Sequence, residues 1–173
     1  QIARDRFDVR IANGTKLEET DTGVRLELDN GESVEAEAIL VATGRTPNGD
    51  QMDLDKAGIE LLADARVSTD EFGRTTAEGV WALGDVSSPY MLKHVANAET
   101  RAVQHNLLHP EDLRPLPHDN VPAAIFTHPQ IATVGLTEKQ AQQKGFDVTV
   151  KVQNFGDVAY GWAMEDHLSL IHI

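Results

Sequence analysis

Two short runs of apolar residues, each followed closely by a glycine, most constrain the fold of this chain. They are residues 39–42 (Ile-Leu-Val-Ala) and the first four of residues 80–85 (Val-Trp-Ala-Leu-Gly-Asp). Runs without polar alternation are typical of strands buried on both faces, as in a parallel sheet covered by helices. Gly44 and Gly84 then mark where the two predicted strands end. The pattern predicts an α/β fold.

The segment before the first run has the alternation of half-buried strands. Residues 24–28 and 34–38 alternate between apolar and polar side chains, and residues 29–31 (Asp-Asn-Gly) separate them. Residues 7–11 form a shorter apolar run that ends at Asn13-Gly14. Glycine-containing turns between short strands are hairpin signals. We therefore expect strands at 7–11, 24–28 and 34–38.

A helix is expected after the second apolar run. Ser88 and Pro89 have the residue types of an N-cap and a first helical position. We expect this helix over residues 90–107, where apolar residues recur at helical spacing. Those that roughly share one face are Leu92, Val95, Ala96, Ala102, Val103 and Leu107.

The last third of the chain has the pattern of a linker followed by short strands and a short helix. Three prolines fall between residues 109 and 120 and indicate the linker. A helix is expected to begin at Thr137 and to stop before Gly145. The expected strands are 121–126, 131–134 and 148–152.

Gly84 and Asp85 are the strongest candidates for a binding site. In open α/β sheets, ligands bind beyond the carboxyl ends of the strands. Glycine lets a backbone come close to a ligand, and an aspartate can accept hydrogen bonds from sugar or ribityl hydroxyls. The alternative is that Asp85 only stabilises a turn.

The first turn of the expected helix is a second candidate. It presents backbone N–H groups and a partial positive charge, which stabilise an anion or a carbonyl that gains negative charge. The alternative is an amphipathic helix whose first turn faces water. The residues concerned are Met91, Leu92, Lys93 and His94.

Gly44 and Arg45 form a third candidate, in a loop that we interpret as a domain crossing. Gly44 would admit a cofactor close to the backbone, and Arg45 would pair with an anion. The alternative is a turn with a solvent-exposed arginine.

Composition excludes several classes of protein. Fifteen Lys and Arg against 28 Asp and Glu give a net charge of −13, which opposes nonspecific nucleic-acid binding. The chain has no cysteine, so it holds no disulfide or thiolate metal site, and seven histidines form no HExxH or HxH cluster. No apolar stretch approaches the ~18–20 residues of a membrane span, and no secretory signal is visible. We expect a cytoplasmic location without membrane, metal or nucleic acid.

The order of three segments carries a family resemblance. Residues 42–48 (Ala-Thr-Gly-Arg-Thr-Pro-Asn), 81–86 (Trp-Ala-Leu-Gly-Asp-Val) and 126–138 follow one another along the chain. Together they resemble the flavin-dependent pyridine nucleotide–disulfide oxidoreductases, and the likeness covers residues 1–166. The resemblance implies a mixed α/β and α+β fold that binds FAD and NADPH, with NADH as the other possible nucleotide.

The resemblance also implies a domain map and roles for the candidates. Residues 1–47 would end the NAD(P)H-binding domain, 48–119 would return to the Rossmann-like FAD-binding domain, and 120–166 would begin the α+β dimerisation domain. Asp85, with Gly84, would bind the ribityl or pyrophosphate region of FAD. Residues 91–94 would face the flavin pyrimidine ring, and Gly44, with Arg45, would lie beside the nicotinamide nucleotide.

In such enzymes electrons pass from NADPH through FAD and a cysteine pair to a disulfide. The chain has neither that pair nor GxGxxG, so we expect a catalytically inactive fragment of a homodimeric enzyme. Residues 84–97 and 156–166 most resemble a member of the family that reduces a low-molecular-weight disulfide, and this resemblance implies such a substrate. The alternatives are a lipoamide dehydrogenase-like member or a non-catalytic dimerisation module. Residues 167–173 depart from the family pattern and are expected to be foreign.

Overall fold

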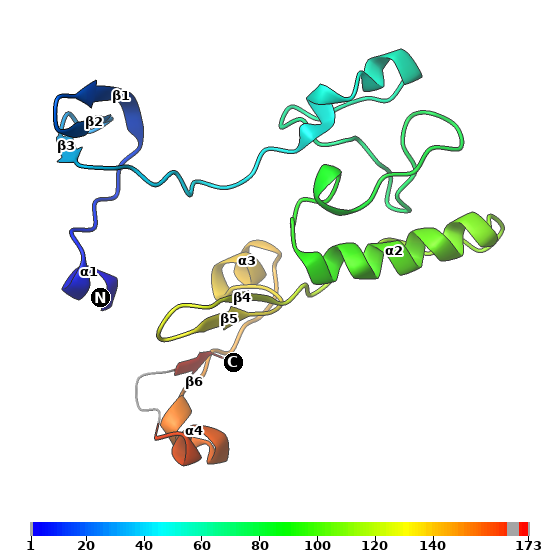
Figure 1. Ribbon diagram of the computed structural model, residues 1–173. Coiled ribbons are helices and arrows are strands. Elements are labelled where there is room, and N and C mark those ends of the chain that lie inside the picture. Colours follow the sequence, from blue (N-terminus) through cyan, green and yellow to red (C-terminus); the bar gives the residue numbers. More distant parts are fainter. Residues whose placement is uncertain (1, 166–169, 173) are drawn as a thin grey trace. The chain divides into compact units, whose positions relative to one another are not determined.

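The computed structural model describes residues 2–165 and 170–172 (Figure 1). Contacts within the chain divide it into two compact units, Gln1–Arg45 and Thr46–Ile173. The positions of these parts relative to one another are not determined.

The first unit is a three-stranded antiparallel sheet in the order β1-β2-β3, preceded by the short helix α1. Leu26 in the middle strand pairs with Leu17 on one side and Val34 on the other. The Arg25 guanidinium forms an ion pair with Glu35 on the neighbouring strand. The elements are α1 (Ile2–Arg6), β1 (Gly14–Thr20), β2 (Gly23–Leu28) and β3 (Ser33–Ala36).

Two of the four predicted strands of this unit are confirmed, and the first is wrong. The strand paired with β2 is β1, at Gly14–Thr20, whereas residues 7–11 form none. The reason lies at Asn13, whose side chain donates to Asp29 at 2.7 Å while its backbone N–H donates to the same carboxylate at 3.1 Å. Asn13 therefore holds the chain just before β1 and does not close a turn after a strand at 7–11.

The strand predicted at residues 39–42 is also wrong. This segment has no regular secondary structure, and the Leu40 side chain is 90% exposed. A parallel strand is stable only when neighbours from distant parts of a chain pair with it. Among the described residues, none pairs with this segment.

The second unit begins with turns and short 3₁₀-helices that lead to the long helix α2. The strand predicted at 80–85 is wrong, because only Trp81 pairs, in an isolated antiparallel bridge with Arg74. The residue next to it forms a hydrogen bond within the loop instead, because the Ala82 N–H donates to the Gly73 carbonyl at 3.0 Å. The elements are η1 (Asn48–Gln51), η2 (Leu54–Ala57), η3 (Gly84–Val86) and α2 (Lys93–Leu108).

Helix α2 confirms the predicted helix but not its start. It begins at Lys93, with Leu92 as N-cap, so Ser88 and Pro89 lie outside it. Two features prevent an earlier start: the Ser88 N–H donates to the Gly84 carbonyl at 2.7 Å, and Met91 has a φ of +48°. A positive φ is incompatible with a right-handed helix.

The buried face of α2 is more polar than predicted. Val95 and Val103 are buried as expected, but Leu107 is 56% exposed. Glu99 and Asn106 are fully buried on the same face, each 0% exposed. Their spacing from Val95 and Val103 is helical, yet hydrophobic periodicity takes polar residues as outward-facing. The prediction therefore missed both.

The rest of the second unit consists of short strand pairs and helices. The strands predicted near 121–126 and 131–134 are confirmed as an antiparallel pair, and the helix that follows Thr137 has a capping box made with Gln140. The strand predicted at 148–152 is displaced to Val152–Asn154. The elements are β4 (Ala123–Ile125), β5 (Ile131–Thr133), α3 (Glu138–Gln143), β6 (Val152–Asn154), η4 (Phe155–Asp157), α4 (Ala159–Ala163) and β7 (Leu170–His172).

The hypothesis that residues 167–173 are foreign falls mainly on residues outside the described part of the chain. Within it, the backbone of β7 pairs antiparallel with β6.

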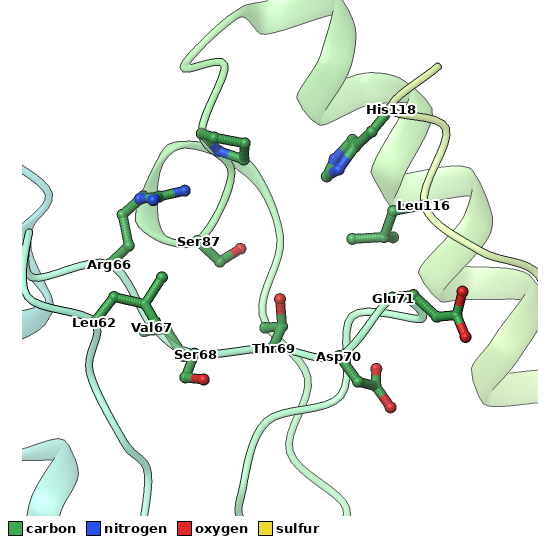
Figure 2. Close-up of a pocket in the computed structure, with 11 residues that line it drawn as sticks. Leu62, Arg66, Val67, Ser68, Thr69, Asp70, Glu71, Ser87, Leu116 and His118 are labelled. Atoms are coloured by element: carbon green, nitrogen blue, oxygen red, sulfur yellow. The ribbon is translucent and has the colours of Figure 1, made fainter. Parts of the chain in front are cut away.

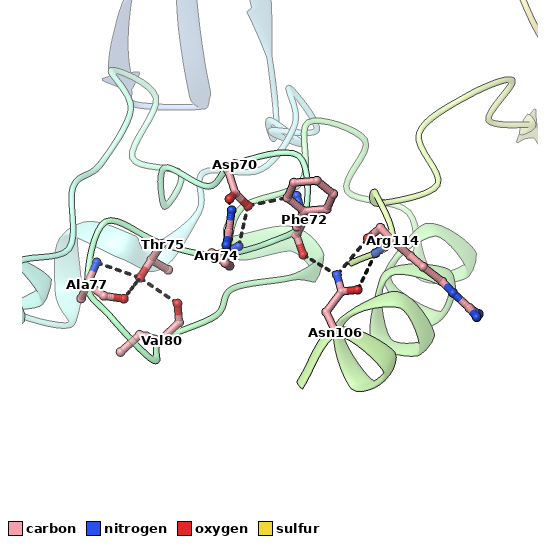
Figure 3. A network of polar contacts seen from close by, with 8 residues as sticks. All are labelled: Asp70, Phe72, Arg74, Thr75, Ala77, Val80, Asn106 and Arg114. Carbon is pink, nitrogen blue, oxygen red and sulfur yellow. Dashed lines mark hydrogen bonds and ion pairs between the residues drawn. The ribbon is translucent and has the colours of Figure 1, made fainter. Parts of the chain in front are cut away.

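The buried amide of Asn106 ties two loops to α2 (Figure 3). Its Nδ2 donates to the Phe72 carbonyl at 3.1 Å and to the Arg114 carbonyl at 2.8 Å. Its Oδ1 accepts from the Arg114 N–H at 2.7 Å. One side chain thus provides the hydrogen-bond partner for three backbone groups of the two loops.

Replacing Asn106 by Ala is expected to lower the free energy of unfolding of the second unit by roughly 2–3 kcal/mol, because buried backbone groups lose their partners. Urea denaturation followed by tryptophan fluorescence measures this, since both Trp81 and Trp162 lie in that unit. Gln104→Ala, at an exposed position of the same helix, is the control and should change stability by less than about 0.5 kcal/mol. Equal effects of the two substitutions would contradict the role of Asn106.

Candidate functional site

The turn at Gly84 is the centre of the candidate site. Gly84 has a φ of +72°, a value that favours glycine, and it follows the extended residue Leu83. Its carbonyl accepts from Ser87 at 3.0 Å and from Ser88 at 2.7 Å. A Cβ at Gly84 would lie 3.5 Å from the Ala96 Cβ, so the turn packs closely on the first turns of α2.

The carboxylate of Glu99 holds this turn from inside. The Gly84 N–H donates to Glu99 Oε2 at 2.6 Å, and Glu99 Oε1 lies 2.6 Å from His118 Nε2. Glu99 is not among the residues predicted from the sequence. The signal that would have found it is a carboxylate placed four residues after Val95 and four before Val103, in the middle of the buried face.

Asp85 projects from this turn into solvent. It is exposed, and within the part of the chain that the structure describes its carboxylate makes no hydrogen bond or ion pair. Asp85 therefore does not cap the turn that carries it, which was the alternative interpretation of its sequence position. An exposed carboxylate on a rigid turn can accept hydrogen bonds from ligand hydroxyls.

The N-terminus of α2 lies beside this turn. Leu92 as N-cap makes no side-chain capping bond, and the first turn holds no acidic residue. The partial positive charge of the helix end is therefore not neutralised by its own first turn. Lys93 and His94 are exposed, and His94 Nε2 lies 2.8 Å from the Pro122 carbonyl. Met91 and Leu92 precede the helix and are half-buried.

The structure thus brings six of the eight predicted residues together, and the other two belong to the first unit. Gly44 has a φ of +122°, and a Cβ there would meet no described atom within 4 Å. Gly44 and Arg45 are both exposed. Because the two units are not placed relative to one another, these two residues form a separate candidate.

A pocket of about 280 Å³ lies near the Gly84 turn (Figure 2). Figure 2 shows Arg66 and His118 on opposite sides of it, with Ser68, Thr69 and Asp70 along its floor. None of the eight predicted residues lines it, although Ser87 and His118 connect it to the Gly84 turn.

Asp70, on the floor of this pocket, organises the loop that forms it (Figure 3). Partial burial by itself would raise the pKa of the Asp70 carboxyl. Hydrogen bonds from the Arg74 N–H, the Arg74 guanidinium and the Phe72 N–H outweigh burial and hold the pKa below its ordinary value of 3.8. The ionised carboxylate therefore stabilises the folded loop.

Among the described residues, no group of His, Cys, Asp and Glu is arranged to hold a metal ion. The same residues include no helix with the length and apolar character that crossing a membrane requires.

The sequence is similar to known proteins along most of its length. Residues 2–102 match the family Pyridine nucleotide-disulphide oxidoreductase, and residues 121–173 match the dimerisation domain of that family. The chain therefore belongs to the pyridine nucleotide-disulphide oxidoreductase family. Its fold comprises an FAD-binding region and the start of a dimerisation domain, as the resemblance predicted.

The chain is also similar to individual proteins. The chain is 52% identical over 178 residues to mycothione reductase from Mycobacterium tuberculosis H37Rv, an alignment that covers 100% of the chain and 39% of that protein. It is 40% identical over 136 residues to dihydrolipoyl dehydrogenase from Halobacterium salinarum, covering 76% and 28%. The HOCl-induced flavoprotein disulfide reductase RclA from Escherichia coli matches with a TM-score of 0.77 and 25% identity, covering 93% of this chain and 37% of that structure. The chain thus spans well under half the length of these relatives.

Asp70→Asn is expected to destabilise the second unit above pH 3.8, the ordinary pKa of Asp, and to matter progressively less below it. A carboxylate whose pKa is depressed by folding contributes stability that is present above the unfolded pKa and is lost as pH falls through the folded pKa. Urea denaturation of both proteins between pH 7 and pH 2 measures the difference.

Asp50→Asn, at an exposed position in η1, is the matched control and should shift stability by less than about 0.5 kcal/mol throughout. A difference between Asp70→Asn and the unsubstituted chain that stays constant down to pH 2 would contradict the assignment.

Proposed function

We propose that this chain is the flavin-facing part of a disulfide reductase that passes electrons from NADPH through FAD and a cysteine pair to the disulfide of mycothione. The observation that carries the proposal is the placement of the exposed Asp85 carboxylate, on the Gly84 turn, beside the uncapped N-terminus of α2 in a member of this family. Because the chain has no cysteine, the redox-active pair belongs to another part of the enzyme.

The residues present fit a flavin. The Asp85 carboxylate would accept hydrogen bonds from ribityl hydroxyls, and the positive φ of Gly84 turns the chain there without a side chain in the way. The first N–H groups of α2, at Lys93 and His94, would stabilise negative charge on the pyrimidine side of the ring. The flavin would supply the redox chemistry, and these groups would hold and orient it.

Gly44 and Arg45 are proposed to contact the nicotinamide nucleotide. Gly44 is exposed in a conformation that favours glycine, which leaves its backbone open to a ligand. Arg45 supplies a positive charge next to it. The proposal names NADPH as this nucleotide, and NADH is the alternative.

The choice of mycothione rests on the 52% identity to mycothione reductase across the whole chain. A second candidate, a dihydrolipoyl dehydrogenase, is favoured by the 40% identity to the Halobacterium salinarum protein over 76% of the chain. The match to the dimerisation domain supports a homodimer. The cytoplasmic location and the domain boundaries at 47, 119 and 166 stay predictions.

The complete product of the gene that encodes this chain tests the proposed function. It is expected to purify as a yellow dimer that oxidises NADPH when mycothione disulfide is supplied. Dihydrolipoamide with NAD⁺ is the competing assay, and activity only there would replace the first candidate by the second. The 173-residue chain by itself is expected to keep no FAD through gel filtration and to be inactive, and stoichiometric FAD in it would overturn that expectation.

Asp85→Ala in the complete protein is expected to weaken flavin binding by about ten- to a hundredfold. The reason is the loss of charge-assisted hydrogen bonds worth roughly 1.5–3 kcal/mol. Flavin absorbance per protein after gel filtration measures the retention. Asp50→Ala, which removes an exposed aspartate from η1, is the control and should leave the flavin content unchanged. Equal flavin content in the two variants would show that Asp85 does not contribute to flavin binding.

A further inference from the structure

Glu99 is a buried carboxylate with both oxygen atoms engaged, and it joins three segments of the second unit. It lies on α2, it accepts from the Gly84 N–H at 2.6 Å, and it pairs with His118 of the linker at 2.6 Å. Its side chain is 0% exposed, whereas that of His118 is 32% exposed. Neither partner is close to Glu99 in sequence, since Gly84 is 15 residues before it and His118 is 19 after it.

The segment between the Gly84 turn and α2 also contacts the linker and the turn. The Tyr90 hydroxyl donates to the His118 carbonyl at 3.0 Å, and the two rings meet edge to face with centroids 5.1 Å apart. The Ser88 N–H donates to the Gly84 carbonyl at 2.7 Å. The peptide groups on both sides of Gly84 are therefore held, one by Glu99 and the other by the turn itself.

A carboxylate is an unfavourable residue on a helix face whose only role is to pack against the rest of the unit. Removing an ionised group from water is costly unless its partners compensate, and apolar residues of similar volume are often as stable or more stable at such positions. Glu99 differs from an apolar residue because its hydrogen bonds are directional. A charge-assisted hydrogen bond fixes the orientation of the Gly84 peptide group, and Asp85 is the residue that follows.

We propose that Glu99 is the positioning residue of the candidate site, which acts by fixing the Gly84 peptide so that Asp85 is presented beside the N-terminus of α2. Glu99 does not touch the ligand, because it is fully buried beneath the turn. The flavin as ligand rests on the proposed function, but the geometry belongs to the chain itself.

Asn106 is a matched comparison for Glu99. It lies on the same face of α2, is also 0% exposed, and also binds backbone groups of two distant segments. Its partners are Phe72 and Arg114 and not Gly84. A substitution at Asn106 therefore reports what the loss of a buried polar residue does to the helix, without touching the turn.

Nuclear magnetic resonance of the 173-residue chain tests the geometry. A hydrogen bond to a carboxylate moves an amide proton downfield, so Glu99→Gln is expected to shift the Gly84 amide proton upfield. Asn106→Ala is expected to leave that proton in place while lowering stability. The same result in both variants, or an unshifted Gly84 proton in Glu99→Gln, would overturn the proposal.

A measurement on the unsubstituted chain keeps the proposal testable if a variant does not fold. A scalar coupling between the Gly84 amide nitrogen and the Glu99 carboxylate carbon is expected, because such couplings pass through hydrogen bonds. Its absence in a spectrum that shows the corresponding couplings of α2 would count against the bond from Gly84 to Glu99.

The complete protein then shows whether positioning matters for binding. Glu99→Gln is expected to lower flavin retention by about tenfold, whereas Asn106→Ala, compared at temperatures equally far below each unfolding midpoint, is expected to retain it. A shifted Gly84 proton with unchanged flavin retention would refute the positioning role. If the unsubstituted protein binds no flavin, the proposed function fails, while the Gly84 measurements still decide the geometry.

Discussion

The buried carboxylate of Glu99 is the interaction on which the arrangement of the candidate site depends. Its oxygens accept from the turn at Gly84 and pair with His118 in the linker, and α2 supplies the rigid base between them. This one side chain therefore joins the turn, the helix and the linker. Asp85 lies beside the helix end because its neighbour is held there.

Asn106, near the C-terminal end of α2, has the same kind of role as Glu99 in the middle of the helix. Both residues replace backbone pairing in loops that have little secondary structure of their own. The second unit is thus organised by a helix with a polar buried face more than by a continuous sheet. The exposed segment at 39–42 and the single bridge at Trp81 show how little sheet pairing the two predicted strands find within the described residues.

Local signals in the sequence were reliable where the structure they specify is local. The capping box at Thr137, the strands around residues 29–31 and the pair β4–β5 depend on neighbours a few residues away. The start of α2 was misplaced because a serine and a proline satisfy the N-terminal pattern, whereas the hydrogen bond from Ser88 to Gly84 and the backbone of Met91 exclude it. Strand β1 was missed since its start depends on Asp29, sixteen residues later.

By itself the sequence determined the family, because the order of three short motifs can be recognised without knowing which residues are in contact. It also predicted a binding site at Gly84, Asp85 and the start of α2, and the role of these residues in binding stays a proposal. Only the tertiary structure decided that Glu99 and Asn106 face inward. A polar side chain is buried only where other groups of the folded chain form hydrogen bonds with it. The partners of these two residues lie 8 to 34 positions away along the chain and all lie outside α2, so no pattern within the helix encodes them.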